Sequence, residues 1–208
     1  MPSPNDLDEL LTDASGDANP AAEASTEPPD PAQMVELLRS DEKMNQMIAT
    51  RYFCDHQDER AIAPLIDILA QDSCSLTRVS AAYALGRNPS VEAVPTLIEV
   101  LADDWNGYVR KGVVWALGNC GDRRAVEPLV HALKTDISAV RLWAASSLAQ
   151  VAKLEYDDIV QSIPPLISAL RRDKMPAVRS NCAWSLGQLC REMPSNVIYA
   201  TAIDALIE

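Results

Sequence analysis

Apolar residues recur at helical spacing in the stretch from Val109 to Leu133. The first of them, spaced i, i+4, i+7 and i+8, are Val109, Val113, Ala116 and Leu117. At about 100° per residue these positions share one side of a helix, so the pattern predicts an amphipathic helix with a buried stripe. A second apolar run, VEPLVHAL, ends the stretch and predicts a companion helix.

The turn between these two helices falls at Asn119–Arg124. Gly121 can adopt the left-handed backbone conformation that ends helices, and Asp122 can cap the helix that follows. Pro128 fits near the start of that helix, where a missing N–H costs little. The stretch therefore predicts a helix–turn–helix unit.

This unit occurs four times along the chain, and each copy is marked by an arginine. The arginines are Arg78, Arg110, Arg141 and Arg179. Seven positions later stand Leu85, Leu117, Leu148 and Leu186, followed at position +8 by Gly86, Gly118, Ala149 and Gly187. The companion helices open at Leu65, Leu97, Leu129 and Leu166, in steps of 32, 32 and 37 residues. Helix pairs at this period predict an all-α solenoid.

The copies leave three stretches to be assigned. The longer third step predicts a lengthened turn around Leu154–Ser162. Residues 31–56 are expected to form a degenerate capping repeat, with helices at Pro31–Arg39 and Glu42–Cys54 and a polar outer face. Repeats then occupy about 57–201. A truncated repeat at 202–208 begins with the apolar run Ala202–Ile207. Because this run would leave an apolar face uncovered, a further part of the solenoid is expected to follow residue 208.

Residues 1–30 differ in composition from the rest. They hold eight acidic residues and no lysine or arginine, so they predict a disordered acidic tail. The tail accounts for most of the net charge of −12, and the remainder, with 22 acidic and 18 basic residues, is only mildly acidic, which argues against a nucleic-acid-binding surface. Asp6–Leu11 is either one amphipathic turn that docks on a partner or part of a solvated tail.

Composition also bears on location and chemistry. No run of eighteen apolar residues and no signal peptide is present, and the five cysteines form no CxxC pair, which together favour a cytoplasmic protein with reduced thiols. The sequence lacks HExxH, GxSxG, a phosphate-binding glycine loop and paired His-Glu dipeptides, and His131 has no acidic residue at i+4. Cys54-Asp55-His56 offers two metal ligands, but a turn after a helix explains it equally well. No catalytic residue and no metal site are therefore assigned.

An aspartate precedes each marker arginine by five or six residues. These are Asp72, Asp104, Asp136 and Asp173. We expect an internal ladder of aspartates and arginines that caps the helices and ties successive repeats together. A surface for acidic partners is the alternative.

Position +5 of the unit carries large aromatics. It is occupied by Tyr83, Trp115, Ser146 and Trp184, about 145° from the centre of the apolar stripe. Position +9 carries the hydrogen-bonding row Arg87, Asn119, Gln150 and Gln188. Because core packing does not need these side chains, we predict that the two rows form a protein-binding face. The alternative is that each ring lies across the neighbouring repeat.

The units TRVSAAYALGRNPSVEAVPTLIEVL, VRKGVVWALGNCGDRRAVEPLVHAL and VRSNCAWSLGQL resemble the short HEAT-like repeats of the phycobilisome lyase family of cyanobacteria, over residues 57–208. The resemblance implies an armadillo-like superhelix whose second helices line the concave surface. Some members attach or detach bilin chromophores on phycobiliproteins. The chain is also similar to a cyanobacterial HEAT-repeat type that partners an A-type iron–sulfur scaffold.

Two functions follow as expectations. The first is a non-enzymatic scaffold or chaperone without a cofactor, which binds a protein on its concave aromatic face in iron–sulfur cluster or photosynthetic-complex biogenesis. The second is a phycobilin lyase subunit or a phycobilisome-associated chromophore chaperone, in which bilin stacks on the same aromatics. The partner would be an iron–sulfur scaffold or a phycobiliprotein, with no nucleic acid and no membrane insertion.

Overall fold

The computed structural model describes residues 29–152, 155–192 and 197–207. The chain divides after Asp30 into two units, of which Pro31–Glu208 is the larger. The acidic tail, including Asp6–Leu11, lies outside the described residues except for Pro29 and Asp30. In the part that is described there is no strand, so the predicted all-α solenoid is confirmed.

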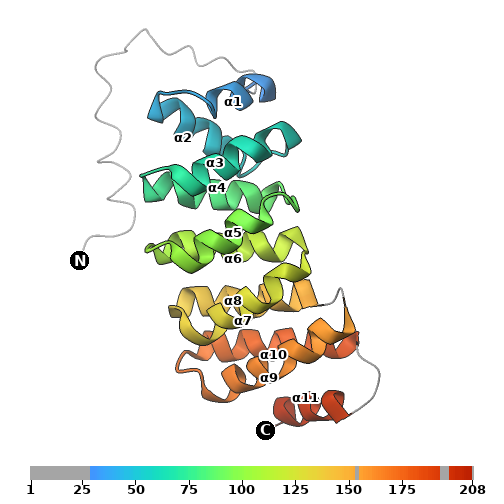
Figure 1. Cartoon of the computed structure of the whole chain (residues 1–208). Helices are drawn as coiled ribbons and strands as arrows, with labels where there is room; N and C mark the ends of the chain where they lie inside the picture. Colours follow the sequence, from blue (N-terminus) through green and yellow to red (C-terminus); the bar gives the residue numbers. More distant parts are fainter. Residues whose placement is uncertain (1–28, 153–154, 193–196, 208) are drawn as a thin grey trace, which may run out of the picture. The chain divides into compact units, whose positions relative to one another are not determined.

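Helices of the larger unit stack in successive pairs, from α1 to α11 (Figure 1). The capping pair is α1 (Pro31–Leu37) and α2 (Lys43–Tyr52). The first helices of the following pairs are α3 (Ile62–Gln71), α5 (Val94–Asp103), α7 (Val126–Thr135) and α9 (Tyr156–Arg172). Their second helices are α4 (Ser75–Arg87), α6 (Gly107–Cys120), α8 (Ser138–Val151) and α10 (Pro176–Arg191). The 3-10 turns η3 (Glu59–Ala61) and η4 (Arg123–Ala125) precede α3 and α7, and α11 (Val197–Ile207) follows α10.

The core is the continuous seam between first and second helices. All eight leucines that define the repeat, four on each kind of helix, are fully buried. The stripe of α6 predicted from its spacing is likewise inaccessible to solvent. Burying a leucine contributes about 1.5–3 kcal/mol relative to leaving it exposed, so the repeated leucines are the main source of cohesion between the pairs.

The predicted turn between α6 and α7 is confirmed in detail. Gly121 ends α6 at φ 61° and ψ 37°, in the left-handed region. The Asp122 carboxylate accepts the backbone N–H of Arg124 at 2.8 Å and so caps η4. Pro128 lies in the first turn of α7, where the helix has no N–H to lose.

The lengthened turn predicted around Leu154–Ser162 is wrong. From Tyr156 onward these residues are helical and extend α9 toward its N-terminus. Ile159 and Ile163 on this extension are buried, so it joins the apolar core instead of looping out. Asp157 and Asp158 in its first turn also favour the helix, because carboxylates are stabilised near a helix N-terminus.

Prolines do not mark the start of α9 as they do in the other first helices. Pro64, Pro95 and Pro128 stand in the first turns of α3, α5 and α7, but Pro164 and Pro165 lie inside α9. A proline inside a helix costs a hydrogen bond. The burial of the preceding turns outweighs this cost. The helix expected to begin at Ala202 similarly begins five residues earlier, at Val197.

The two kinds of helix are spaced differently along the stack. Successive second helices lie in close contact with one another, whereas successive first helices make few contacts. Grooves lie between the first helices, for example between α5 and α7. Successive second helices therefore approach one another more closely than successive first helices do. None of the helices in the described ranges is long and apolar enough to cross a membrane.

Candidate protein-binding face

The exposed side of α4, α6, α8 and α10, which we call the second-helix face, holds the predicted aromatic row. Trp184 on α10 is 49% exposed. Tyr83 on α4 and Trp115 on α6 are half-buried. Ser146 holds the same position on α8, and its hydroxyl accepts a hydrogen bond from the Asn181 side chain of the next second helix. The four positions therefore differ in how much surface they offer a partner.

Tyr83 and Trp115 are packed together between neighbouring repeats. Their ring centroids lie 5.6 Å apart with planes tilted by 46°. The Trp115 ring covers Gly86, where a Cβ atom would collide with it, and the Tyr83 ring lies over Gly112. For these two residues the rings do lie across the neighbouring repeat, and the small residue at position +8 makes room for Trp115 instead of for a partner.

The hydrogen-bonding row at position +9 is also divided. The Asn119 side chain donates to the carbonyl oxygen of Gly86 at 3.0 Å, so it links two repeats. The Gln150 amide lies over Gly118 of the preceding repeat. Arg87 and Gln150 are exposed, and Gln188 is half-buried. The row thus combines links between repeats with groups that face solvent.

Three apolar residues of the face were missed by counting position +5 alone. Leu76 and Tyr108, in the first turns of α4 and α6, are 69% and 70% exposed. Each lies seven residues before an aromatic of the row, two helical turns away on the same side. Trp143 on α8 is half-buried, and the Lys111 ammonium lies 5.9 Å from its ring centroid. A search for apolar residues at seven-residue spacing, outside the stripe, would have found the first two.

The predicted ladder of aspartates and arginines is present along one edge of the stack. Arg78 donates to the carboxylate of Asp104 through Nε and Nη2, at 2.7 and 3.1 Å. Arg110 binds Asp136 and Arg141 binds Asp173 with the same two-pronged geometry. Each of these arginines therefore pairs with the aspartate of the following repeat.

The same side chains also cap their own repeat. The Nη1 atom of Arg110 donates to the carbonyl oxygen of Asp104 at 2.7 Å, and Arg78, Arg141 and Arg179 make the equivalent bond. The Asp104 carboxylate accepts the backbone N–H of Asn106 at 2.8 Å, next to the start of α6. The rungs at Arg78, Arg110 and Arg141 thus satisfy groups at a helix terminus and join two repeats, as the spacing predicted, whereas the bond from Arg179 is to its own repeat.

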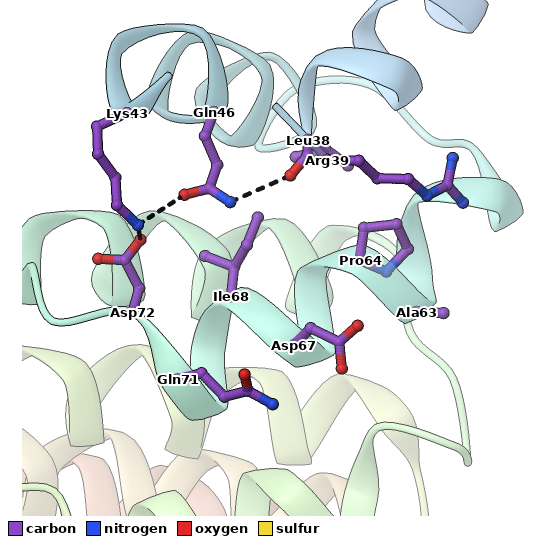
Figure 2. Close-up of a pocket in the computed structure, with 10 residues that line it drawn as sticks. All are labelled: Leu38, Arg39, Lys43, Gln46, Ala63, Pro64, Asp67, Ile68, Gln71 and Asp72. Carbon is purple, nitrogen blue, oxygen red and sulfur yellow. Dashed lines mark hydrogen bonds and ion pairs between the residues drawn. The ribbon is translucent and has the colours of Figure 1, made fainter. Parts of the chain in front are cut away.

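The ladder changes at the capping repeat. Lys43 on α2 replaces the arginine there, and its ammonium lies 2.8 Å from the Asp72 carboxylate. Figure 2 shows this pair beside Gln46, whose amide bonds both Lys43 and the carbonyl oxygen of Leu38. The three residues border a polar hollow of about 590 Å³ between the capping repeat and α3. Lys43 already bonds both Gln46 and Asp72. We therefore interpret the hollow as the place where the ladder ends and not as a binding site.

The geometry of the ladder lowers the pKa values of two of its aspartates. The hydrogen bonds from Arg141 hold the pKa of the Asp173 carboxyl below its ordinary value. Burial raises the pKa of Asp104, but the hydrogen bonds from Arg78 and from the backbone of Asn106 outweigh it, and the net pKa is lowered. Both aspartates are therefore held as carboxylates.

The sulfur and imidazole groups are spread through the described residues and make no cluster of three or more possible metal ligands. The Cys54 thiol points to the carbonyl oxygen of Ser80, and burial raises its pKa to about 11. The His56 ring stacks on Tyr52 at 3.9 Å. Cys54-Asp55-His56 lies at the turn that follows α2.

The stacked pairs, the shared core seam and the ladder define the class of this protein as an α-solenoid. The chain belongs to the HEAT-repeat family: the family described as HEAT repeats matches residues 31–117 and 94–161, and a single HEAT repeat matches 163–193. No curated protein matches the chain.

Several solved structures with the same fold are designed or engineered proteins. An engineered protein is 24% identical, with 86% of this chain and 87% of that chain covered at a TM-score of 0.63. A designed armadillo repeat protein in complex with the peptide (KR)4 is 18% identical, with 86% and 100% covered at 0.63. Designed armadillo repeat proteins for modular peptide recognition are 20% identical, with 85% and 88% covered at 0.63. These likenesses establish the armadillo-like solenoid fold.

Proposed function

We propose that this chain is a scaffold or chaperone that binds another protein along its second-helix face. The observation that carries the proposal is the set of apolar side chains that the core leaves exposed on these helices: Leu76, Tyr108 and Trp184. Exposed aromatic groups of this kind are enriched at protein interfaces. Structural neighbours that bind peptides share the fold, which supports a protein partner.

The test separates binding from folding at Trp184. Because this residue is 49% exposed, we expect Trp184→Ala to lower the free energy of unfolding by less than about 1 kcal/mol. Tryptophans at the centre of an interface commonly contribute about 2 kcal/mol or more to binding, so the same variant should bind its partner roughly thirty-fold more weakly. Urea unfolding and a calorimetric titration on one preparation measure both quantities.

Trp105→Ala is the matched control. Trp105 is 78% exposed but lies in the turn between α5 and α6, so its replacement should change neither stability nor binding. An A-type iron–sulfur scaffold protein and a phycobiliprotein subunit, the partners that the sequence resemblance implies, are the proteins to titrate. If Trp184→Ala unfolds easily yet binds normally, the face is structural and the proposal fails.

A chromophore chaperone or bilin lyase subunit is the second candidate, favoured by the packed pair of Tyr83 and Trp115 beside solvent-facing Arg87. Flat aromatic rings stack on a tetrapyrrole, and a guanidinium binds its propionates. Mixing the protein with free bilin should then shift and sharpen the visible absorption band, and Arg87→Ala should reduce the shift. An unchanged spectrum at millimolar protein would leave the scaffold as the remaining candidate.

A further inference from the structure

Acidic residues are missing from all four second helices. Between them, α4, α6, α8 and α10 contain no aspartate or glutamate. They carry seven basic residues: Arg78, Arg87, Arg110, Lys111, Arg141, Arg179 and Arg191. The chain as a whole has a net charge of −12, so this local excess of positive charge opposes the sign of the molecule.

The first helices have the opposite charge pattern. Together α3, α5, α7 and α9 carry six acidic residues: Asp67, Glu99, Asp103, Glu127, Asp157 and Asp158. Their basic residues are Lys134, Arg171 and Arg172. Five of these six acidic residues are exposed, and Asp158 is buried in a pair with Arg123. The folded unit therefore presents an acidic first-helix face and a basic, aromatic second-helix face.

Not every basic residue of the second helices is available to a partner. Arg78, Arg110 and Arg141 are bound by the aspartates of the ladder. Arg87 is exposed, its side chain makes no ion pair with any carboxylate in the described ranges, and it follows Gly86, on which the Trp115 ring lies. Lys111 faces the Trp143 ring. These two cations therefore lie beside the aromatic groups of the face.

We infer that the segment bound on the second-helix face is an acidic peptide that also carries apolar side chains. This rests on the proposed function and adds the chemistry of the partner. Carboxylates of the segment bind Arg87 and Lys111, and its apolar groups cover Tyr108, Trp115 and Trp184. The preference is the reverse of that of the designed armadillo repeat protein whose bound peptide, (KR)4, is basic.

Three synthetic peptides with one apolar pattern and different charge test the inference: (DL)4, (SL)4 and (KL)4. Each is fluorescently labelled and titrated with the full chain at physiological salt, where attraction by distant charges is screened. The net charge of −12 alone favours (KL)4. The second-helix face instead favours (DL)4, which we expect to bind at least tenfold more tightly than (SL)4, with (KL)4 weakest.

Charge reversal then locates the site. The double variant Arg87→Glu and Lys111→Glu should weaken (DL)4 binding by about tenfold or more and leave (SL)4 within about twofold, since each exposed ion pair contributes modestly. Lys134→Glu is the matched control, because Lys134 is an exposed cation on the first helix α7. It should leave (DL)4 binding unchanged.

Other outcomes separate the two proposals. If (SL)4 or (KL)4 binds best and Trp184→Ala abolishes that binding, the face binds peptides but the acidic preference is wrong. If none of the three peptides binds at millimolar concentration, both the preference and the proposed function fail. Binding of (DL)4 only after removal of residues 1–28 would assign the face to the chain's own acidic segment and overturn the inference as stated.

Discussion

Trp115 and Trp184 hold the same position in the repeat but have different surroundings. Trp115 is half-buried because Gly86, at position +8 of the preceding repeat, leaves space for its ring. The preceding repeat offers Trp184 the methyl group of Ala149 at that position, and Trp184 stays 49% exposed. A glycine at position +8 of the preceding repeat thus goes with a packed tryptophan, and an alanine at that position goes with an exposed one.

Gly86→Ala tests this account. A Cβ atom there would collide with the Trp115 ring, so we expect the variant to lose about 1–3 kcal/mol of stability in urea unfolding. Gly187→Ala is the control, because nothing lies within 4 Å of the added Cβ. Alanine favours helix over glycine, so this variant should gain up to about 1 kcal/mol. Equal effects of the two substitutions would mean that Trp115 does not depend on Gly86.

Thiol reactivity should also differ between residues. Cys74 is exposed at the N-terminus of α4, where hydrogen bonds from the backbone and side chain of Thr77 lower its pKa. Cys182 is buried, and burial raises its pKa to about 12. Because the thiolate is the reactive form, iodoacetamide at neutral pH should modify Cys74 first and Cys182 only after unfolding. Mass spectrometry of timed samples, with Cys74→Ser as control, checks the order.

At the scale of elements, the ladder joins each second helix to the turn of the following repeat. Arg110→Ala would leave the Asp136 carboxylate, 10% exposed in its side chain, without its cation. We expect a loss of about 2–3 kcal/mol, somewhat below the value for a fully buried pair because both groups retain contact with solvent. Thermal and urea unfolding measure it.

Arg124→Ala is the matched control for this rung. Its pair with Asp122 has the same 2.7 Å separation, but the Arg124 side chain is 49% exposed, and its guanidinium also donates to the carbonyl oxygen of Val91 at 3.2 Å, so the two variants differ chiefly in the burial of the ion pair. Such exposed pairs contribute up to about 1 kcal/mol. A loss at Arg124 as large as that at Arg110 would show that burial of the ion pair does not set its contribution to stability.

The ladder also makes stability depend on pH. The folded-state pKa values of Asp104 and Asp173 are lower than those of free carboxyl groups, which are about 3.9. Their contribution is therefore complete above about pH 5 and is lost as pH falls through the unfolded and then the folded pKa. Urea midpoints should drop between pH 5 and pH 3, and Asp173→Asn should flatten that drop. A midpoint independent of pH in this range would contradict the assignment.

For the whole unit, stability is set by contacts between neighbouring repeats. Inner helices such as α6 and α8 have neighbours on both sides, whereas α1 and α11 contact fewer elements of the described chain. In a linear array the ends open first. Hydrogen exchange should therefore be slowest in α6 and α8 and fastest in α1 and α11, with graded protection between them. Uniform exchange across the helices would indicate a single all-or-none unit.

The sequence by itself determined the features that depend on neighbours along the chain. The 3.6-residue period of the α6 stripe, Gly121 at the end of that helix and Asp122 at the next cap are local properties, and each appears in the structure as predicted. The repeat of arginines and aspartates also predicted the ladder. Repetition is a strong signal because equivalent residues make equivalent contacts in each copy of the repeat.

Only the tertiary structure decided what depends on contacts between repeats. The lengthened turn around Leu154–Ser162 was predicted from the repeat spacing alone, but burial of Ile159 and Ile163 makes the residues from Tyr156 onward helical. The pairing of Arg78, Arg110 and Arg141 with the aspartate of the following repeat required the stack. The difference in exposure between Trp115 and Trp184 also depends on the stack. One helix cannot reveal it, because residues of a neighbouring repeat determine how much of a side chain is covered.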